Sequence, residues 1–426
     1  MIKLLHFADA HIDLARQGRH DPESGLPLRV LDFLKSLDTI VDTAIGEKVD
    51  LVIFAGDAYR DRTPAPTYQR EWGKRIMRLS AAGIQTLLVV GNHDVSPASG
   101  RANALQEFET LQVPNVRVIC KPCLLKPADL GGLPVQVIGI PWLNRSGLAA
   151  AMEGEEEGQQ DLISNLEQYL EFIINEFFKE IDLNLPTILT AHALVHGAFF
   201  GSERSIMLGS DFYLPGSIIK DQRLDYVALG HIHTFQNANE GINGEKEKPP
   251  VIYPGSIEKI DFSEAKKQKY FVIINLEKGK ADIKKHLLRG RQFFDRKIHI
   301  KSSEDINQKI LEEFPNEKNL KDSIFRLIVY YPRELDALID EPEIRRKAES
   351  AFEFHFVKRP LLSSRLRLPE DQSITSISPL ELLDLYWKVF PDQKLDTGRL
   401  STLAKDIFQN AEENEAGENQ GVDSAL

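Results

Sequence analysis

The sequence predicts an α/β fold, because apolar runs alternate with helical segments through the first half of the chain. The apolar runs are continuous, which is typical of strands that are buried on both faces of a sheet. Several of these runs end directly in carboxylate, amide or imidazole side chains. Ligands bind at the carboxyl ends of strands in open α/β sheets, so this placement supports the same fold class and indicates a functional site there.

Several apolar runs up to residue 276 are predicted as strands, and the segments of helical periodicity between them are predicted as helices. The strand-like runs are residues 2–8, 50–56, 85–91, 186–191, 225–230, 249–255 and 269–276. The helical segments are residues 28–46, 67–81 and 161–181. The alternation of strand and helix is typical of a sheet that is covered by helices.

The pattern changes after about residue 290, where a smaller α+β domain is predicted. Its elements are strands at 294–300 and 323–331 and helices at 303–314 and 341–351. Two short amphipathic helices are expected at 378–390 and 398–409, and the acidic tail from 411 is predicted to be disordered. These changes divide the chain into a first domain (1–285), the α+β domain (286–370), a helical segment (371–410) and the tail (411–426).

The composition and charge of the chain narrow the range of functions. A net charge of −12 argues against a protein that coats nucleic acid by bulk electrostatics, because phosphate binding depends on clustered Lys and Arg. No apolar run has the length of a signal peptide or a membrane span, so we expect a cytoplasmic protein. Cys120 and Cys123 form a C-x-x-C pair, but two thiols are too few for a structural zinc site, and strand-like flanks disfavour a redox motif.

Side chains that can bind a metal or carry a proton follow five of the predicted strands. They are Asp9, His11, Asp57, Asn92, His93, Asp94, His192, His231 and His233. In D-x-H and H-x-H, alternate residues of an extended segment lie on the same side, so both can face one site. Glycines at 56, 91 and 230 allow the chain to turn sharply away from the strand. We therefore expect these side chains to converge.

The chemistry of this set favours two divalent metal ions. Imidazole nitrogens with carboxylate and amide oxygens, and no thiolate, suit manganese, iron, zinc or cobalt. Seven plausible ligands are too many for one tetrahedral ion, whereas a shared carboxylate can bridge two ions. The remaining pair, His93 and Asp94, could act on a leaving group, with Asp94 fixing the tautomer of His93. A lone D-x-H or G-D is weak, because a single buried histidine is more often a satisfied core residue, whereas "GNHD" and "GHIH" are stronger signals. The prediction rests on the number and order of the five motifs.

The order of these motifs, D-x-H, G-D, G-N-H-D, a lone His and G-H-x-H, resembles that of the calcineurin-like metallophosphoesterase superfamily over about residues 1–260. The resemblance implies a two-sheet core flanked by helices. It implies that one metal is bound by Asp9, His11, Asp57 and His233, and the other by Asp57, Asn92, His192 and His231. A hydroxide that bridges the metals would attack phosphorus in line, while His93, oriented by Asp94, would stabilise or protonate the departing oxygen.

Within the superfamily, the chain resembles the SbcD-type DNA repair exonucleases, in "HFADAHIDL", in "LVIFAGDAYRDR" and in the smaller domain, which matches that family's capping domain. Serine/threonine protein phosphatases are a poorer match, because they have G-D-x-x-D-R-G where this chain has "GDAYRDRTP". The resemblance implies a manganese-dependent exonuclease that acts at DNA ends in double-strand break repair. It also implies that the late helices dock on the coiled coil of an SbcC-type ATPase. A homodimer is compatible with the sequence, which does not fix the oligomeric state.

Two other functions stay open from the sequence. One is a small-molecule phosphodiesterase or phosphatase of the same superfamily, which the extra domain after residue 290 disfavours. The other is a mainly structural role, in which the chain binds DNA ends and supports an ATPase, and the complete ligand set disfavours it. Activity on nucleotides but not on DNA would favour the first, and a metal-loaded protein that is inert on every phosphodiester would favour the second.

DNA contact in an acidic chain must come from local basic stretches. The candidates are residues 284–297, 358–367 and the loop 59–70, although charge runs also occur as solvated faces. The loop follows Asp57 and contains Arg60 and Arg62. SbcD-like nucleases are expected to have Asp or His three residues after the bridging aspartate, where this chain has Arg60. Our hypothesis is that Arg60 holds a DNA phosphate by a forked pair, and the alternative is a surface ion pair with Asp61.

Overall fold

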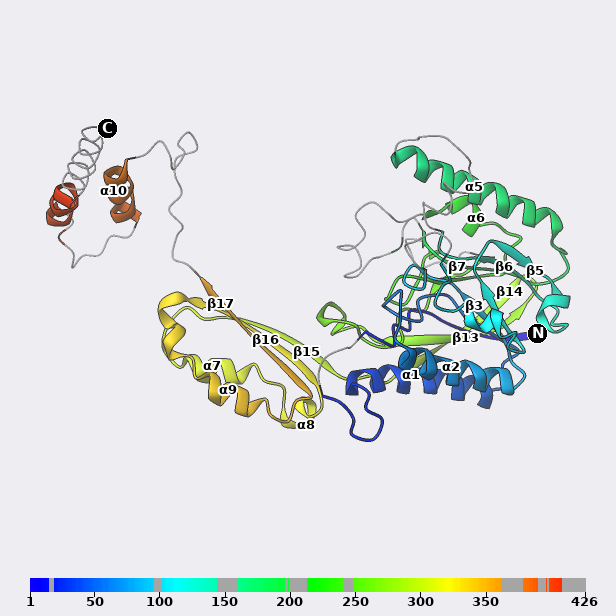
Figure 1. The fold of residues 1–426 in the computed structure, drawn as a ribbon, viewed down its shortest axis with the longest axis horizontal. Coiled ribbons are helices and arrows are strands. Elements are labelled where there is room, and N and C mark those ends of the chain that lie inside the picture. Colours follow the sequence, from blue (N-terminus) through cyan, green and yellow to red (C-terminus); the bar gives the residue numbers. More distant parts are fainter. Residues whose placement is uncertain are drawn as a thin grey trace, which may run out of the picture. The chain divides into compact units, whose positions relative to one another are not determined.

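The structure is a computed structural model that describes residues 1–14, 19–95, 101–143, 159–195, 198, 213–240, 248–361, 378–389, 396 and 398–407 (Figure 1). The chain forms two compact units. The first consists of Met1–Asp295, Pro315–Phe325 and Ser350–Glu353. The second consists of Arg296–Phe314, Arg326–Glu349 and the described part of Phe354–Leu426. No helix in the described ranges combines the length and the apolar character that crossing a membrane requires.

One six-stranded sheet of the first unit has the strand order β14-β13-β1-β2-β3-β4. The strands β1 to β4 run parallel to one another, β13 is antiparallel to β1, and β14 is antiparallel to β13. The parallel strands therefore have their carboxyl ends at one edge of the sheet. The strand bounds are Ile2–Phe7 (β1), Leu51–Phe54 (β2), Gln85–Val89 (β3), Val116–Ile119 (β4), Lys269–Glu277 (β13) and Lys280–Leu288 (β14).

The second six-stranded sheet has the order β11-β12-β10-β7-β6-β5. Its four inner strands are parallel, and the edge strands β5 and β11 are antiparallel to their neighbours. A short pair of strands, β8 (Leu194–Val195) and β9 (Tyr213–Leu214), lies outside both sheets. The bounds in the sheet are Cys123–Leu125 (β5), Gln136–Ile140 (β6), Thr187–His192 (β7), Tyr226–Gly230 (β10), Gln236–Asn237 (β11) and Val251–Tyr253 (β12).

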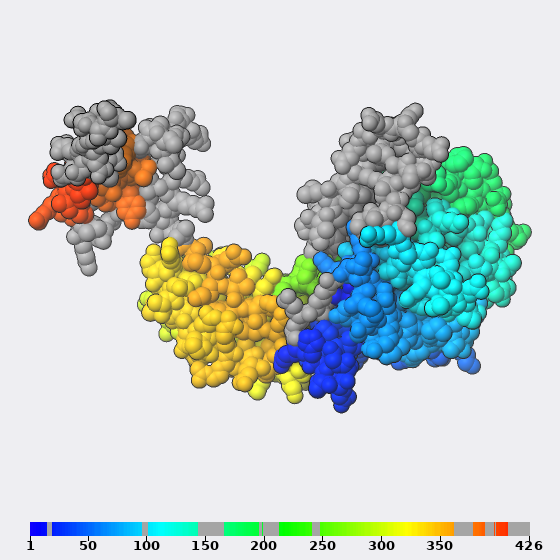
Figure 2. Space-filling model, viewed as in Figure 1, coloured from blue at the N-terminus to red at the C-terminus, as the bar shows by residue number. Residues whose placement is uncertain are grey.

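The two sheets pack face to face, with helices on both outer faces (Figure 1). One apolar cluster lies between the sheets and takes side chains from both, including Leu4 and Val137. A second cluster joins the first sheet to α1 and α2, and a third joins the second sheet to α5 and α6. In the space-filling view, residues from α1 to β6 (blue to cyan) form a continuous surface (Figure 2). The helix bounds are Leu28–Gly46 (α1), Pro66–Ala81 (α2), Glu107–Thr110 (α3), Gln159–Glu180 (α5) and Gly216–Ile219 (α6).

Helix α1 shows how the sequence pattern produces this packing. Its buried residues Val30, Phe33, Leu37, Val41 and Ala44 recur at intervals of three or four, so they form one apolar stripe along the helix. This stripe belongs to the cluster on the outer face of the first sheet. The strands of that sheet bury side chains on both faces, which explains why they appear in the sequence as continuous apolar runs.

A three-stranded sheet with the order β15-β16-β17 supplies most of the strand residues of the second unit. Alternate residues of its central strand, Leu327, Val329 and Tyr331, are buried, as are Ile310 and Ile344 of two adjoining helices. One face of this sheet is therefore apolar. The bounds of these elements are Phe293–His299 (β15), Ile306–Glu312 (α7), Ile324–Pro332 (β16), Glu341–Lys347 (α9) and Glu353–Leu361 (β17). The short helix α8 (Glu317–Leu320), between α7 and β16 in sequence, belongs to the first unit.

Two short helices lie near the C-terminal end of the described chain, at α10 (Pro379–Val389) and at residues 398–407. Oγ of Ser401 lies 3.4 Å from Oδ1 of Asp384, so the two helices contact each other. No side chain described in these helices is buried, and Leu403 and Ile407 are more than half exposed. The predicted apolar faces also include residues 390 and 408, which lie outside the described residues together with the predicted disordered tail from 411.

The predicted fold class is confirmed, because the first unit has two sheets flanked by helices. The flanks of the C-x-x-C pair are strands β4 and β5, as the sequence indicated. Strands β6, β14 and β17 were not predicted. Strand β14 alternates exposed and partly buried residues at the edge of its sheet, and its lysines made it look like a basic stretch rather than a strand. The domain boundaries at 285, 370 and 410 stay predictions.

Candidate metal centre

The candidate site lies at the carboxyl ends of strands from both sheets of the first unit. Strands β1, β2 and β3 end shortly before the first three motifs, β7 ends with a motif histidine, and β10 ends just before the last motif. The structure brings six of the predicted ligands into two sets, and in each set the ligand atoms lie within 4.8 Å of one another. The first group is Asp9, His11 and His233, and the second group is Asp57, His192 and His231.

The backbone at the site repeatedly enters the left-handed region, which residues other than glycine rarely adopt. The φ angles are 50° at Asp9, 40° at His11, 64° at Asp57 and 98° at His231. Such conformations cost on the order of 1–3 kcal/mol each and cluster at functional sites. The expectation that D-x-H and H-x-H are extended, with alternate residues on one side, was therefore wrong. The side chains converge because the chain turns sharply after each strand.

Two glycines of the motifs are required because ligand-bearing segments approach each other closely. A Cβ atom at Gly91 would lie 2.2 Å from Oδ1 of Asp57, and one at Gly230 would lie 2.0 Å from the carbonyl oxygen of Ala55. Both distances are far inside van der Waals contact. At Gly56, a Cβ atom would lie 2.3 Å from Nδ1 of His192, and its φ of 99° also gives the sharp turn that was expected at all three positions.

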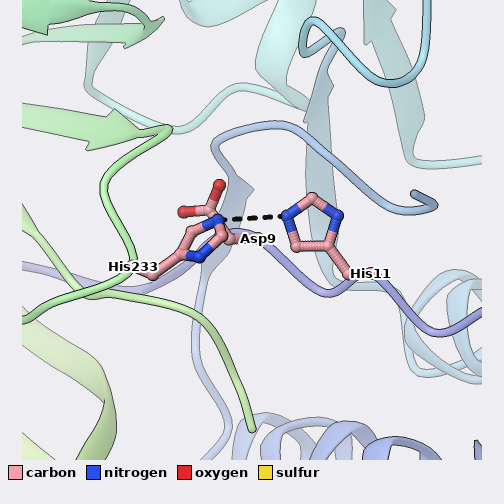
Figure 3. Close-up of side chains that lie close together, drawn as sticks. All are labelled: Asp9, His11 and His233. Carbon is pink, nitrogen blue, oxygen red and sulfur yellow. Dashed lines mark hydrogen bonds between the residues drawn. The ribbon is translucent and has the colours of Figure 1, made fainter. Parts of the chain in front are cut away.

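In the first group, His11 and His233 face each other through their Nε2 atoms, which lie 3.3 Å apart (Figure 3). Nδ1 of His11 lies 3.3 Å from the carbonyl oxygen of Tyr59. A carbonyl can only accept, so Nδ1 carries the hydrogen and Nε2 carries the lone pair. The Asp9 carboxylate beside them accepts the backbone N–H of His231 at 3.0 Å. The two Nε2 atoms attract each other at this distance only when a cation or a proton lies between them.

In the second group, Nδ1 of His192 donates to the carbonyl oxygen of Ala55 at 2.7 Å. Its Nε2 faces Oδ2 of Asp57 at 3.3 Å and Oδ1 of Asn92 at 2.9 Å. Nδ1 of His231 lies 3.2 Å from the same Nε2 and 3.0 Å from the Asn92 oxygen. Four possible ligand atoms thus surround one point, including the neutral amide oxygen that the sequence predicted.

Asp57 lies between the two groups. Its Oδ2 is 3.3 Å from Nε2 of His192 and 3.8 Å from Nε2 of His11. Its Oδ1 accepts the backbone N–H of His93 at 2.8 Å, which fixes the orientation of the carboxylate. One oxygen of this side chain therefore faces both groups, as a carboxylate that bridges two cations would.

Burial and charge leave most of these side chains in the form that binds metal. Burial lowers the pKa of His11 and of His231 to about 3, and that of His233 well below its usual value, so all three are neutral. For Asp57 and His192 burial is the largest single influence and opposes ionisation, but their mutual charge attraction, their hydrogen bond and neighbouring groups together exceed it. These interactions hold the pKa of Asp57 well below its ordinary value and raise that of His192 to about 9. Neutral imidazoles and an ionised carboxylate fit divalent cations, and only His192 must lose a proton first.

His93 and Asp94 do not form the pair that the sequence suggested. Nδ1 of His93 lies 2.8 Å from the carbonyl oxygen of Arg60, which is its hydrogen-bond acceptor. The buried Asp94 carboxylate instead accepts the backbone N–H groups of Asp57 at 2.9 Å, Gly91 at 3.0 Å and Ala58 at 3.0 Å. The expectation that Asp94 fixes the tautomer of His93 was therefore wrong, because Asp94 is directed at the main chain around Asp57.

Arg60 and Arg62 lie in the loop after Asp57, and both are exposed. Burial is the main cause of the lowered pKa of His11, and the charge of Arg60 adds to it, which places the guanidinium near the first group. Asp61, the expected partner of Arg60 in the alternative interpretation, accepts the N–H and the hydroxyl of Thr63 at 3.0 and 3.1 Å.

Two residues near the site were missed by sequence reasoning. Trp142 follows strand β6, and its ring centroid is 5.1 Å from that of His231 and 6.1 Å from that of His192. It was missed because β6 itself was not predicted. Asp13 is buried and accepts the backbone N–H groups of Arg60 and Asp61. Its signal was present in the sequence, because "DAHID" continues the spacing of D-x-H by one more polar residue.

Comparison with known proteins gives a family match over the part of the chain that contains the site. The model of the calcineurin-like phosphoesterase family matches residues 2–235. The chain is 29% identical over 291 residues to the SbcD subunit of the nuclease SbcCD of Escherichia coli K12, an alignment that covers 66% of each chain. This chain thus spans just under two thirds of that relative's length.

Two further similarities are more restricted. The chain is 37% identical over 111 residues to the DNA double-strand break repair protein Mre11 of Halobacterium salinarum, which covers 26% of each chain. Among solved structures, a dimetal phosphatase from Danio rerio aligns with 68% of this chain and 97% of its own, at 12% identity and a TM-score of 0.38. The sequence similarities thus fall on the calcineurin-like phosphoesterase family, on a nuclease subunit and on a DNA double-strand break repair protein.

Proposed function

Because the chain belongs to the calcineurin-like phosphoesterase family, we propose that it is a nuclease that hydrolyses phosphodiester bonds at DNA ends with two divalent cations, manganese being the metal. The observation that carries this proposal is the pair of ligand groups on either side of Asp57. Its similarity to a nuclease subunit of E. coli supports DNA as the substrate over a small phosphodiester. Two-metal hydrolysis of a phosphodiester needs such a site, whereas a protein that only binds DNA ends does not.

The ligands would divide between the two cations with Asp57 shared. One cation would be held by Asp9, His11, Asp57 and His233, and the other by Asp57, Asn92, His192 and His231. When bound, a pair of divalent cations supplies a water molecule activated for attack and neutralises the charge of the phosphate. Asp94 supports this arrangement indirectly, because its carboxylate holds the main chain at Asp57.

His93 is the residue that we propose acts on the substrate. Its ring stands perpendicular to that of His11, with 5.3 Å between the centroids, so it borders the first group. With Nδ1 donating to a carbonyl, Nε2 is left to contact the departing oxygen, and with a hydrogen on both ring nitrogens the Nε2–H would stabilise or protonate that oxygen. His93 is half-buried, which leaves the ring accessible to a phosphate at the site.

DNA would be held by exposed cations of the first unit. Arg60 and Arg62 are next to the ligands in sequence and are exposed. Lys284 and Lys285 lie on the edge strand β14, and Nζ of Lys285 is 4.8 Å from the ring centroid of Phe235. The candidate stretch 358–367 is described only to Leu361, on strand β17, and its remaining residues lie outside the described chain.

The test is hydrolysis of an end-labelled duplex with manganese, magnesium or zinc, compared with a cyclic nucleotide and a simple phosphodiester. We expect manganese-dependent cleavage of the duplex. His93→Gln should still bind two ions by calorimetry but lose about a hundredfold or more in turnover, as expected for loss of a general acid. Asp225→Asn is the control, because Asp225 is buried at the opposite end of β10. Cleavage of nucleotides without cleavage of DNA would overturn the proposal in favour of a small-molecule enzyme.

We further propose that the two C-terminal helices bind a coiled-coil ATPase of the SbcC type. The support is that no described side chain of these helices is buried, although their leucines and aromatic residues recur at helical spacing. Truncation after residue 376 should abolish co-purification with the ATPase and leave manganese-dependent cleavage unchanged. A truncated chain that still co-purifies would contradict this assignment.

A further inference from the structure

We infer that Asp13 is a positioning residue for His93 and that it acts through the main chain of Arg60. The inference rests on the proposed function for the role of His93, but the contacts themselves do not depend on it. A carboxylate, two backbone N–H groups, one backbone carbonyl and an imidazole form a continuous chain of hydrogen bonds. The sequence predicted that the Asp94 side chain would orient His93. In the structure, this series of hydrogen bonds contacts His93 instead.

The first half of this chain links Asp13 to the loop after Asp57. Oδ1 of Asp13 accepts the backbone N–H of Arg60 at 2.5 Å, and Oδ2 accepts that of Asp61 at 3.1 Å. Asp13 is 1% exposed, so its interactions are little screened by water. Hydrogen bonds to an ionised acceptor are roughly twice as strong as neutral ones, so this carboxylate fixes the loop firmly.

The second half links the loop to His93. The carbonyl oxygen of Arg60 lies 2.8 Å from Nδ1 of His93. The N–H of Arg60 is bound to Asp13, so the same residue is held on one side while its carbonyl accepts on the other. Since a carbonyl can only accept, Nδ1 of His93 must be the donor. Nε2 is therefore the nitrogen that is left to contact a substrate.

Neighbouring main-chain contacts show that the loop is held along its length beside the segment that carries Asp13. The backbone N–H groups of His11 and Ile12 donate to the carbonyl oxygens of Asp57 and Ala58 at 3.2 and 3.1 Å. These contacts align the two segments, but they stop before Arg60. The Asp13 side chain continues this alignment to Arg60 and Asp61, and the carbonyl of Arg60 accepts the hydrogen bond from His93.

The side chain of Arg60 is not part of this series of hydrogen bonds. The hydrogen bonds to Asp13 and to His93 are made by the backbone N–H and carbonyl groups of Arg60. Here the acceptor is a main-chain carbonyl, and every residue type supplies one. The residue type that matters is therefore the one at position 13. The Asp13 carboxylate has two oxygens, and each accepts one backbone N–H group of the loop.

The test compares Asp13→Asn with Asp225→Asn in the full chain. The amide at position 13 keeps the size of the side chain but replaces one acceptor oxygen by an N–H₂ group that faces a backbone donor. Asp225 is a matched control, because it is also buried and accepts two backbone N–H groups, of Thr187 at 2.7 Å and of Gly279 at 2.6 Å. Asp13→Ser, which keeps one acceptor, is the second variant if Asp13→Asn does not fold.

The decisive measurement is the tautomer of His93 in the metal-free protein, read from ¹⁵N NMR of labelled histidine and assigned with His93→Gln. We expect the parent chain, Asp225→Asn and Arg60→Ala to show His93 with its hydrogen on Nδ1. Asp13→Asn should lose this preference. With manganese and a simple phosphodiester, Asp13→Asn should lose about tenfold or more in kcat, as for other residues that orient catalytic groups. Its KM and its number of bound ions should not change.

An unchanged His93 tautomer in Asp13→Asn would overturn the inference, whatever the rate. So would a loss of kcat no larger than that of Asp225→Asn, because the effect would then reflect stability alone. If every metal-loaded form were inert on phosphodiesters, the proposed function would fail, while the NMR comparison would still decide whether Asp13 orients His93.

Discussion

The two ligand groups of the candidate metal centre have the same composition but opposite electrostatics. Each has two histidines and one aspartate. In the first group, burial keeps both histidines neutral, and their Nε2 atoms face each other at 3.3 Å. In the second, burial also disfavours a charged His192, but the charge and hydrogen bond of Asp57, together with Asp9 and the Ala55 carbonyl, raise the pKa of His192 to about 9, while His231 stays neutral. One group is therefore ready for a cation, and the other must first release a proton.

The difference comes from the position of one carboxylate. Asp57 is closer to His192 than to His11, at 3.3 against 3.8 Å, so its attraction acts mainly on the second group. The first group's own aspartate, Asp9, already accepts the backbone N–H of His231. The two groups contain the same types of ligand, but their net charge differs because Asp57 and Asp9 contact different partners. This difference cannot be predicted by counting ligands in the sequence.

The largest expected effect removes the feature that both groups share. Asp57→Ala should abolish manganese binding in both groups, because one Asp57 oxygen faces both of them. Activity on DNA should fall by about a thousandfold or more, since loss of metal catalysis removes several kcal/mol and each 1.4 kcal/mol is a factor of ten. Calorimetric titration with manganese measures the number of bound ions. Binding of two ions by Asp57→Ala would show that the groups are independent and that Asp57 does not bridge them.

The next prediction separates the groups. His233→Gln removes a ligand of the first group only, and His231→Gln one of the second only. Each variant should bind one ion tightly in place of two and retain little activity, because two-metal hydrolysis needs both cations. Thermal unfolding of the metal-free variants controls for damage to the fold. If either substitution removed both ions, the two groups would have to be treated as one site.

The fold and most of this site could be predicted from the sequence, because both depend on side-chain type. Buried strands appear as apolar runs, and metal ligands are chemically distinctive at strand ends. The acceptor for His93 could not be predicted, because the Arg60 carbonyl is a main-chain group that every residue has. The left-handed turns at Asp9 and His11 were also hidden, because Asp and His adopt positive φ more often than most non-glycine residues but still rarely, so the signal is weak. Strand β14 was missed because its exposed residues are lysines at a sheet edge, where apolar side chains are not required.

A third prediction uses pH to expose the difference between the groups. The pKa of His192 is raised to about 9, so its proton is present at pH 7 and must leave when a cation binds. Affinity at the second group should therefore rise with pH, by up to about tenfold per unit, and level off above about pH 9. The first group should be nearly independent of pH over this range, since burial already keeps its histidines neutral.

Calorimetry of His233→Gln and His231→Gln in buffers of different ionisation enthalpy counts the protons released on binding. We expect about one proton at pH 7 from His233→Gln, which retains the second group, and fewer from His231→Gln. Equal proton release from the two variants would mean that Asp57 and His192 do not hold a proton in the metal-free chain.

The smallest expected effect concerns Arg60, whose charge acts on the first group, because it contributes to the lowered pKa of His11. If its guanidinium holds a DNA phosphate beside that group, Arg60→Ala should weaken duplex binding and reduce the slope of log K against log salt by about one unit. The position of His93 should not change, because the variant keeps the carbonyl that His93 contacts. Metal affinity should stay within about threefold, since an exposed charge is screened by solvent.

Arg117→Ala is the matched control, because it changes the net charge by the same amount. Arg117 is an exposed residue of the edge strand β4, and it forms an ion pair with Asp129. A smaller slope for Arg60→Ala than for both the parent chain and Arg117→Ala would assign one phosphate contact to Arg60. Superimposable salt curves for the two variants would instead show that only the net charge matters. Arg60 would then contribute only its main chain to the site, through the carbonyl that His93 contacts.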